Sequence, residues 1–477
     1  MRSKDGTLNA NRLLAQLFGS PRYQASGDDR EMTTSNTAIP VDELPSLDSL
    51  FSDLHPALTE RQAAIESARC LYCYDAPCIK ACPTGINIPS FIAGIHSGNL
   101  EGAAQTILES NIMGGSCSRV CPTEILCEQS CVRNKEDECA PVLIGSLQRY
   151  ATDNAKFIGH PFRRAEATGK TIAVIGAGPA GLSCAHRLAM LGHEVDVFEA
   201  EAKIGGLNEY GIAKYKLTND FARQEAEFIL GIGGIKVHTD TALGKDVQLA
   251  DLTDKFDAVF LGIGLQSTRQ LLLEHEDHSA VMDAVDYIKT LRQAADIDEL
   301  TVPESAIVIG AGNTAIDIAC QLKRLGSEDV TLVYRRGEKD MGATPHEQEI
   351  AKQHQVRIRT WSRPESIEVD GSGRLIAMNF RRTEVKDGSL TDTELSYQIP
   401  CAAVFKAVGQ TLAYPQTNSA TVPVIKHGKI SVDEQFKTSI EKVFAGGDCT
   451  GIGQDLTVEA VQQGKLAALA IHQFLLS

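Results

Sequence analysis

Cysteine is the reactive side chain that this 477-residue sequence concentrates most, because nine of its 13 cysteines lie between positions 70 and 139. Eight of the nine form two groups: Cys70, Cys73, Cys78 and Cys82, then Cys117, Cys121, Cys127 and Cys131. Thiolates are soft ligands for iron–sulfur clusters or zinc, and in two-cluster ferredoxin patterns the Cys before a Pro binds the other cluster. By that logic Cys70, Cys73 and Cys78 hold one cluster, and Cys82, which precedes Pro83, helps to hold a second. Eight thiolates would suit two 4Fe-4S clusters.

Zinc is the alternative metal for these cysteines, since paired cysteines also form four-thiolate zinc sites. Such sites usually contain two Cys-x2-Cys pairs, and this spacing occurs only once here, at Cys70 and Cys73. Zinc also carries no electrons, whereas the motifs that follow are typical of redox cofactors. Iron–sulfur clusters are therefore favoured.

A first glycine-rich turn follows an apolar run at 171–175 and has the pattern Gly176-x-Gly178-x-x-Gly181, with Pro179 and Ala180 inside it. In this dinucleotide-binding pattern the glycines allow a tight turn, close approach of a pyrophosphate and contact between helix and strand. A helix to about residue 191 and a strand at 194–198 complete the pattern. Glu199 ends that strand and can accept hydrogen bonds from ribose hydroxyls.

A second turn of the same kind follows the apolar run at 306–309 and contains Gly310, Gly312, Asn313 and Thr314. Ala315 replaces its third glycine, which the pattern tolerates. The next strand ends in Arg335 and Arg336 instead of an acid. Guanidinium groups match a 2′-phosphate in charge and geometry, so this turn favours NADPH over NADH.

A short strand at 443–445 leads to Gly447 and Asp448, and a helix runs from about Leu456 to the end of the sequence. In flavoproteins with two dinucleotides such an Asp contacts the ribityl chain, and the N-terminus of the helix faces the flavin, where reduction develops negative charge. The first turn therefore predicts FAD and the second a nicotinamide coenzyme. Further cofactor contacts are expected from Gly206, Leu207, Ala407, Val408, Gly409, Leu456 and Thr457.

The elements that position these residues suggest an α/β fold with two Rossmann-like domains, preceded by an α-helical domain with two iron–sulfur clusters. Helical stretches at 60–70 and 88–111 would carry the cysteines on their ends and loops. The expected domains are a polar arm at 1–50, the cluster domain at 51–155, an FAD domain at 170–295 and 405–477, and an NAD(P) domain inserted at 296–404.

The composition describes an ordinary globular protein, with 43% hydrophobic and 23% charged residues and a net charge of −16. The acidic balance argues against nucleic-acid and anionic-membrane partners. The sequence shows neither a long apolar run nor the apolar core of a signal peptide, so we expect a cytoplasmic protein. Disulfides are rare there, which supports the interpretation of the cysteines as cluster ligands.

The cysteine motifs, the 144–149 segment Ile-Gly-Ser-Leu-Gln-Arg and the 456–465 segment resemble the electron-input half of dihydropyrimidine dehydrogenase and its bacterial stand-alone NAD(P)H-oxidising subunit. The small subunit of glutamate synthase is a more distant relative. The resemblance implies one cluster held by Cys70, Cys73, Cys78 and Cys131. It implies a second held by Cys82, Cys121, Cys127 and Gln148. Spacing alone would nominate Cys117, which stays the alternative to Gln148.

Two positions depart from this family pattern. Lys216 stands where an arginine on the flavin side is usual, which keeps the charge but not the planar fork. Gly342 stands where the animal enzymes have an arginine near the 2′-phosphate, which weakens the expectation of NADPH.

The resemblance implies that NAD(P)H reduces FAD, and that electrons then pass through two 4Fe-4S clusters to an FMN-containing subunit that reduces uracil or thymine. An FMN barrel needs roughly 250 residues, for which this sequence leaves no room, so we expect that subunit on a partner chain in a hetero-oligomer. We expect no catalytic acid or base, and His346 and Glu347 are interpreted as a solvated helix start. The alternatives are a glutamate synthase small subunit and a zinc- and flavin-binding scaffold without redox turnover.

Overall fold

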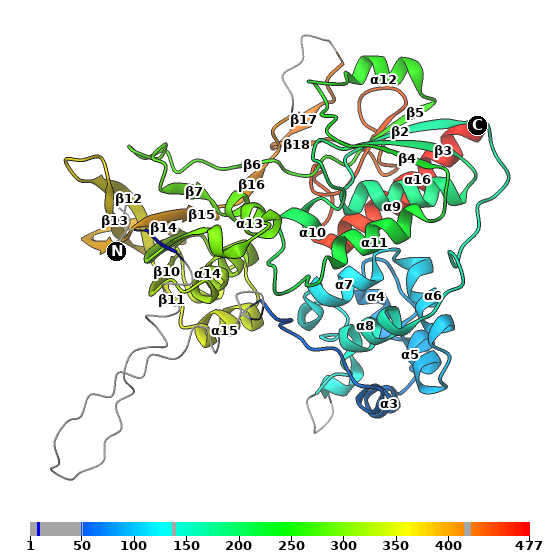
Figure 1. Ribbon diagram of the computed structural model, residues 1–477, viewed down its shortest axis with the longest axis horizontal. Coiled ribbons are helices and arrows are strands. Elements are labelled where there is room, and N and C mark those ends of the chain that lie inside the picture. Colours follow the sequence, from blue (N-terminus) through cyan, green and yellow to red (C-terminus); the bar gives the residue numbers. More distant parts are fainter. Residues whose placement is uncertain (1–6, 10–48, 50, 136–139, 415–420) are drawn as a thin grey trace. The chain divides into compact units, whose positions relative to one another are not determined.

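The computed structural model describes residues 7–9, 49, 51–135, 140–414 and 421–477. Most of the polar arm predicted at 1–50, together with Cys139, lies outside the described residues. The chain divides into two compact units: unit 1 comprises Met1–Ser52, Ala213–Tyr215 and Thr268–Gly409, and unit 2 comprises Asp53–Ile212, Lys216–Ser267 and Gln410–Ser477. Figure 1 labels the helices and strands of both units.

Unit 2 begins with a helical region that carries the cysteines. Its helices are α3 (Glu60–Ala68), α4 (Pro77–Ala81), α5 (Ile88–His96), α6 (Leu100–Ser110), α7 (Gly114–Val120) and α8 (Ile144–Asn154), with 3-10 turns at Thr123–Ile125 and Val132–Lys135. Local capping explains several of the starts, because the side chains of Thr59, Asn87 and Asn99 accept backbone N–H groups of α3, α5 and α6. The predicted helical stretch at 88–111 is two helices. Gly98, at φ 77°, ends the first of them.

A five-stranded parallel sheet forms the second part of unit 2, in the order β19-β5-β2-β3-β4. Its strands are β2 (Thr171–Ile175), β3 (Glu194–Phe198), β4 (Ile235–His238), β5 (Ala258–Leu261) and β19 (Val443–Ala445). Its helices are α9 (Pro179–Met190), α10 (Leu207–Tyr210), α11 (Phe221–Leu230), α12 (Leu249–Lys255) and α16 (Thr457–Leu476). In Figure 1, α16, in red, runs alongside α9.

The helical region and the sheet of unit 2 share one hydrophobic core. Leu108, Ile112 and Met113, from the end of α6 and the start of α7, pack in the same buried cluster as Ile172 and Val174 of β2. A shared core fixes the two parts against each other, because close-packed interiors resist relative displacement. The cysteine region and the first glycine turn therefore belong to one compact unit with a shared core.

Unit 1 contains a second parallel sheet, in the order β11-β10-β9-β15-β7. Its strands are β7 (Val281–Asp283), β9 (Ser305–Ile309), β10 (Asp329–Val333), β11 (Arg357–Arg359) and β15 (Ala403–Lys406), and its helices are α13 (Ala284–Gln293), α14 (Asn313–Arg324) and α15 (Pro345–Gln353). An antiparallel sheet adds β12 (Ser362–Val369), β13 (Leu375–Lys386) and β14 (Ser389–Pro400). β1 (Thr7–Asn9) pairs with β8 (Thr301–Pro303).

The inserted unit begins earlier than the boundary at 296 taken from the sequence. Strand β7 pairs in parallel with β15, so the chain joins the sheet of unit 1 from Val281 and not only from residue 296. The chain passes from unit 2 into unit 1 at β6 (Ser267–Thr268) and returns to unit 2 at β16 (Gln410–Thr411). In unit 2, β17 (Ile425–Lys426) pairs with β18 (Lys429–Ile430). Within the described residues, no helix combines the length and the apolar character needed to span a membrane.

Candidate functional site

Four of the thiols line a pocket between the loop after α3, helix α4 and the segment before the second 3-10 turn. They are Cys70, Cys73, Cys78 and Cys131, and apolar walls come from Ile88, Ile92, Val142 and Ile144. Burial, together with the neighbouring Cys131 and Cys70, raises the pKa of Cys78 to about 11. Burial also raises the pKa of Cys70, to which Cys73 and Cys131 add. The four predicted ligands of the first cluster therefore lie together.

The second group of thiols gathers around helix α7. Cys117 lies on α7 and Cys121 follows its last residue, and a hydrogen bond with Cys117 is the largest cause of the raised pKa of Cys121. Burial, Cys127 and Cys82 raise it further. Gln148 lies on α8, is 7% exposed, and donates its amide N–H to the backbone oxygen of Gly114 at 2.7 Å. Both candidates for the fourth ligand, Cys117 and Gln148, thus adjoin α7.

These thiol groups have the chemistry that a cluster needs. Burial disfavours thiolates, and a bound cation is what compensates for several thiolates in one apolar pocket. In the described residues no three His, Cys, Asp or Glu side chains converge as ligands of one ion. A four-iron cluster has a different requirement, because each thiolate binds its own iron and the sulfurs lie around the cluster.

The first glycine turn has the close contacts that only glycine permits. Gly176 has φ 94°, and a Cβ there would lie 2.5 Å from the backbone oxygen of Gly262. A Cβ at Gly181 would lie 1.8 Å from the backbone oxygen of Gly176. Gly178 caps α9, which begins at Pro179, so the free N–H groups of that helix end are available to a pyrophosphate.

Glu199 fastens this turn to the end of β3. Glu199 is 7% exposed, and its carboxylate accepts the N–H of Ala177 at 2.7 Å and that of Glu201 at 2.9 Å. Burial raises the pKa of Glu199, while these backbone hydrogen bonds oppose the rise. The predicted ribose acceptor therefore adjoins the glycine turn.

Three further segments converge on the same turn. A Cβ at Gly206, which precedes Leu207 and α10, would lie 2.6 Å from Cα of Gly178, and a Cβ at Gly447 would lie 2.8 Å from Cβ of Ala180. Thr457, next to the cap residue Leu456 of α16, donates its hydroxyl to Asn208 at 3.3 Å. The predicted flavin segments of unit 2 are thus brought together around α9.

Asp448 follows Gly447 in a largely buried position. Burial and, to a smaller extent, Asp455 raise the pKa of Asp448 to about 6, while Lys429 opposes the rise. Asp448 is thus ionised at neutral pH and can accept hydrogen bonds from hydroxyl groups of a bound cofactor.

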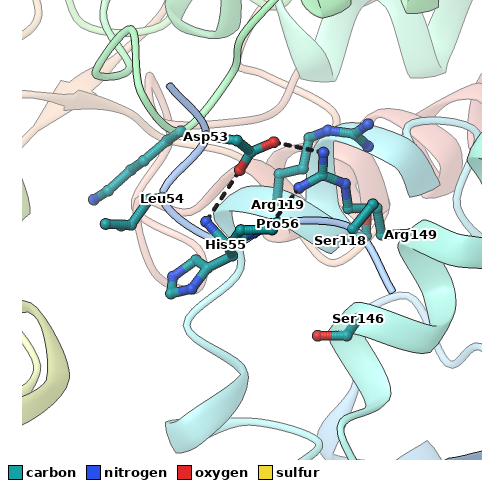
Figure 2. A pocket seen from close by; sticks show the side chains of 10 residues that line it. Asp53, Leu54, His55, Pro56, Ser118, Arg119, Ser146 and Arg149 are labelled. Atoms are coloured by element: carbon teal, nitrogen blue, oxygen red, sulfur yellow. Dashed lines mark hydrogen bonds and ion pairs between the residues drawn. The ribbon is translucent and has the colours of Figure 1, made fainter. Parts of the chain in front are cut away.

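Lys216 lines a small pocket beside the cluster region, together with Arg119 and Arg149. In Figure 2 the carboxylate of Asp53 lies between the backbone N–H of His55, at 3.0 Å, and the guanidinium of Arg149, at 2.5 Å. Polar side chains of helices α7 and α8 thus line the pocket together with the segment 53–57. A role of Lys216 in binding the flavin stays a prediction.

The second glycine turn lies in unit 1, between β9 and α14. Gly310 has φ 141°, and a Cβ there would lie 2.2 Å from the backbone oxygen of Ala407, so the segment from Ala407 through Val408 to Gly409 adjoins the turn. Gly312 caps α14, whose first residues are Asn313 and Thr314. The predicted coenzyme segments therefore meet at one edge of the sheet.

Arg335 and Arg336 are exposed just beyond the end of β10. Their backbone is held by residues that the sequence did not single out: Thr383 donates its hydroxyl to the oxygen of Arg335 at 2.7 Å, and Trp361 donates its N–H to the oxygen of Arg336 at 2.9 Å. Gly342 approaches the second glycine turn, because a Cβ there would lie 3.8 Å from Cα of Gly312. The basic pair is thus presented on an anchored turn.

Two charged residues at the contact between the cluster helices and the flavin sheet were likewise not singled out. Glu225 on α11 accepts the N–H of Ser116 on α7 at 2.9 Å, and Lys465 on α16 donates to backbone oxygens of the cluster region. Their partners lie more than 100 positions away in the sequence, so no local motif reveals them.

Comparison with known proteins first defines the class. Residues 170–464 match the family of pyridine nucleotide-disulphide oxidoreductases, and residues 48–159 match the family described as dihydropyrimidine dehydrogenase domain II, 4Fe-4S cluster. The chain belongs to the pyridine nucleotide-disulphide oxidoreductases and is an NAD(P)H-dependent oxidoreductase with FAD and an N-terminal 4Fe-4S domain. The predicted fold class is confirmed.

The relatives then narrow the class. The NAD-dependent dihydropyrimidine dehydrogenase subunit PreT of Escherichia coli is 35% identical over 438 residues, which cover 89% of this chain and 97% of that protein. The glutamate synthase (NADPH) small chain of Escherichia coli is 33% identical over 449 residues, which cover 89% of this chain and 94% of that one. The predicted resemblance to both kinds of subunit is confirmed.

Among solved structures, FprA from Mycobacterium tuberculosis matches with a TM-score of 0.54 at 18% identity, covering 64% of this chain and 84% of that chain. This similarity concerns the fold alone.

Proposed function

We propose that this chain is the electron-input subunit of a dihydropyrimidine dehydrogenase. It takes electrons from NAD(P)H and delivers them to an FMN-containing partner chain that reduces uracil or thymine to the 5,6-dihydropyrimidine. FAD supplies the conversion of a two-electron hydride into single electrons, and two 4Fe-4S clusters supply the onward path. We also propose a hetero-oligomer in the cytoplasm.

One observation carries this proposal: the first glycine turn and eight grouped thiols belong to one unit with a continuous core. The cluster residues that we propose are Cys70, Cys73, Cys78 and Cys131 for one cluster, and Cys82, Cys121, Cys127 and Gln148 for the other, with Cys117 as the alternative to Gln148. The chain's own residues bind and orient the cofactors. No side chain is assigned as acid or base.

The anchored pair Arg335 and Arg336 supports NADPH as the coenzyme. The names of the two relatives differ on this point, since the dehydrogenase subunit is called NAD-dependent and the synthase chain carries NADPH in its name. The preference is therefore argued from the guanidinium groups, which match a 2′-phosphate.

The test is an anaerobic pull-down of the tagged chain, followed by assays of the recovered complex with NADPH or NADH. We expect an FMN-containing partner and formation of dihydrouracil from uracil. A complex that forms glutamate from glutamine and 2-oxoglutarate, and no dihydrouracil, would instead support a glutamate synthase small subunit. The 33% identity to that small chain makes it the second candidate.

A further inference from the structure

Helix α16 joins the candidate flavin site to the cysteine region. Its cap residue, Leu456, lies at the flavin end, and Lys465 lies nine residues later, about 14 Å along the helix axis at 1.5 Å per residue. The ammonium group of Lys465 donates to the backbone oxygen of Ser110, at the end of α6, at 2.6 Å, and to that of Thr84 at 3.2 Å. Lys465 of α16 thus contacts two segments of the cluster region, the end of α6 and the loop at Thr84.

The segment that Lys465 holds includes a proposed cluster ligand. Thr84 is 4% exposed and lies two residues after Cys82, and its hydroxyl is 3.3 Å from the sulfur of Cys82. The groups that influence Lys465 are Arg187 on α9, which lowers its pKa, and Cys82, which raises it. Burial is the largest cause and brings the pKa of Lys465 to about 8, so the amine stays mainly protonated at neutral pH.

We propose that Lys465 is a positioning residue that fastens helix α16 to the Cys82 segment, and that its charge raises the reduction potential of the cluster bound through Cys82. Reduction adds negative charge to a cluster, and a fixed cation nearby stabilises the reduced form. This inference rests on the cluster assignment of the proposed function. Lys465 would favour entry of electrons into the cluster bound through Cys82 over the cluster proposed at Cys70, Cys73, Cys78 and Cys131.

The test compares Lys465→Met, Lys465→Gln and Lys465→Arg in the holoprotein by redox titration with detection of each cluster by electron paramagnetic resonance. Gln keeps a donor for the backbone oxygens but removes the charge, whereas Arg keeps the charge. In the Met and Gln variants we expect a negative shift in the midpoint potential of one cluster, the one bound through Cys82. In the Arg variant this potential should stay close to that of the wild type. The rate at which NAD(P)H bleaches the flavin should stay unchanged in all three.

Lys170→Met is the matched control, because Lys170 carries the same charge in unit 2 but pairs with Asp257 at 3.0 Å. This variant should leave the midpoint potentials of both clusters unchanged. An unchanged midpoint in Lys465→Gln, or equal shifts of both clusters, would overturn the proposal. Zinc without acid-labile sulfide in the wild-type protein would refute the proposed function itself, and so is distinguishable from failure of the Lys465 role.

Discussion

At the scale of single residues, two candidates compete for one coordination position. Cys117 is hydrogen-bonded to Cys121, whereas the amide nitrogen of Gln148 donates to Gly114, which leaves its carboxamide oxygen available to a cluster. Sulfur is the softer ligand, but the resemblance to the dihydropyrimidine enzymes implies the amide. Chemistry and family pattern therefore point to different residues.

Replacing each candidate separates them. We expect Gln148→Leu to lower the iron content from about eight toward about four per chain, while Cys117→Ser keeps about eight, because only a lost ligand releases a cluster. Iron and acid-labile sulfide measured on anaerobically purified protein provide the check. The reverse pattern would assign Cys117 as the ligand.

Asp448 predicts a pH-dependent affinity for FAD. Burial raises its pKa from 3.8 to about 6, so the empty site is ionised at pH 7.5 and becomes protonated below pH 6. If the carboxylate accepts a hydroxyl of the cofactor, binding favours the ionised form, and affinity falls by up to about tenfold per pH unit below 6.

Quenching of FAD fluorescence by apoprotein between pH 7.5 and 5 measures this dependence. In Asp448→Asn the affinity should already be lower at pH 7.5, and the part of the pH dependence due to this group should vanish. The same pH profile in wild type and variant would exclude Asp448 as the titrating group.

The arginine pair predicts the coenzyme preference. Changing Arg335→Ala together with Arg336→Ala should raise the KM for NADPH at least about tenfold more than the KM for NADH, since charge-assisted contacts to a 2′-phosphate are lost. Arg374→Ala, which removes an arginine paired with Asp370 on the turn between β12 and β13, is the control. Equal effects on both coenzymes would refute the phosphate role.

At the scale of elements, the close packing of α9 and α16 supports the flavin site. A Cβ at Gly464 would lie 2.1 Å from the backbone oxygen of Ala180, a residue of the first glycine turn. Alanine normally stabilises a helix interior relative to glycine by about 1 kcal/mol. Here the backbone contact reverses that preference.

We expect Gly464→Ala to destabilise the protein by on the order of 3 kcal/mol and to weaken FAD retention, because α16 must move away from α9. Thermal unfolding and the ratio of flavin to protein absorbance report the two effects. Gly451→Ala is the matched control, since an added Cβ there meets no atom within 4 Å. A Gly464→Ala protein as stable and flavin-loaded as this control would contradict the packing argument.

The sequence predicted a helix or strand correctly where a local pattern alone determines the backbone geometry. The buried run at 171–175 and its glycine turn gave β2 and α9, because a parallel interior strand is continuously apolar. The stretch at 88–111 was not resolved into two helices, since Asn99 acts as a cap only after Gly98 turns the chain. The boundary at 296 missed β7, whose place in the sheet depends on pairing with β15.

At the scale of the whole molecule, long-range contacts make the cluster region and the flavin sheet one unit. Glu225 is 7% exposed, burial raises its pKa to about 7, and it accepts the N–H of Ser116. Arg119 lies 3.7 Å above the ring of Phe221 at the start of α11. Glu225 and Phe221 contact α7 across more than 100 residues of sequence, so such a unit emerges only from the folded chain.

We propose that this chain transfers electrons from NAD(P)H through FAD into two clusters. A redox titration of the anaerobically purified holoprotein, followed by electron paramagnetic resonance, tests this proposal most directly. We expect two distinct signals of reduced 4Fe-4S clusters, each integrating to about one spin per FAD. A single cluster signal, or zinc with no reducible cluster, would contradict it.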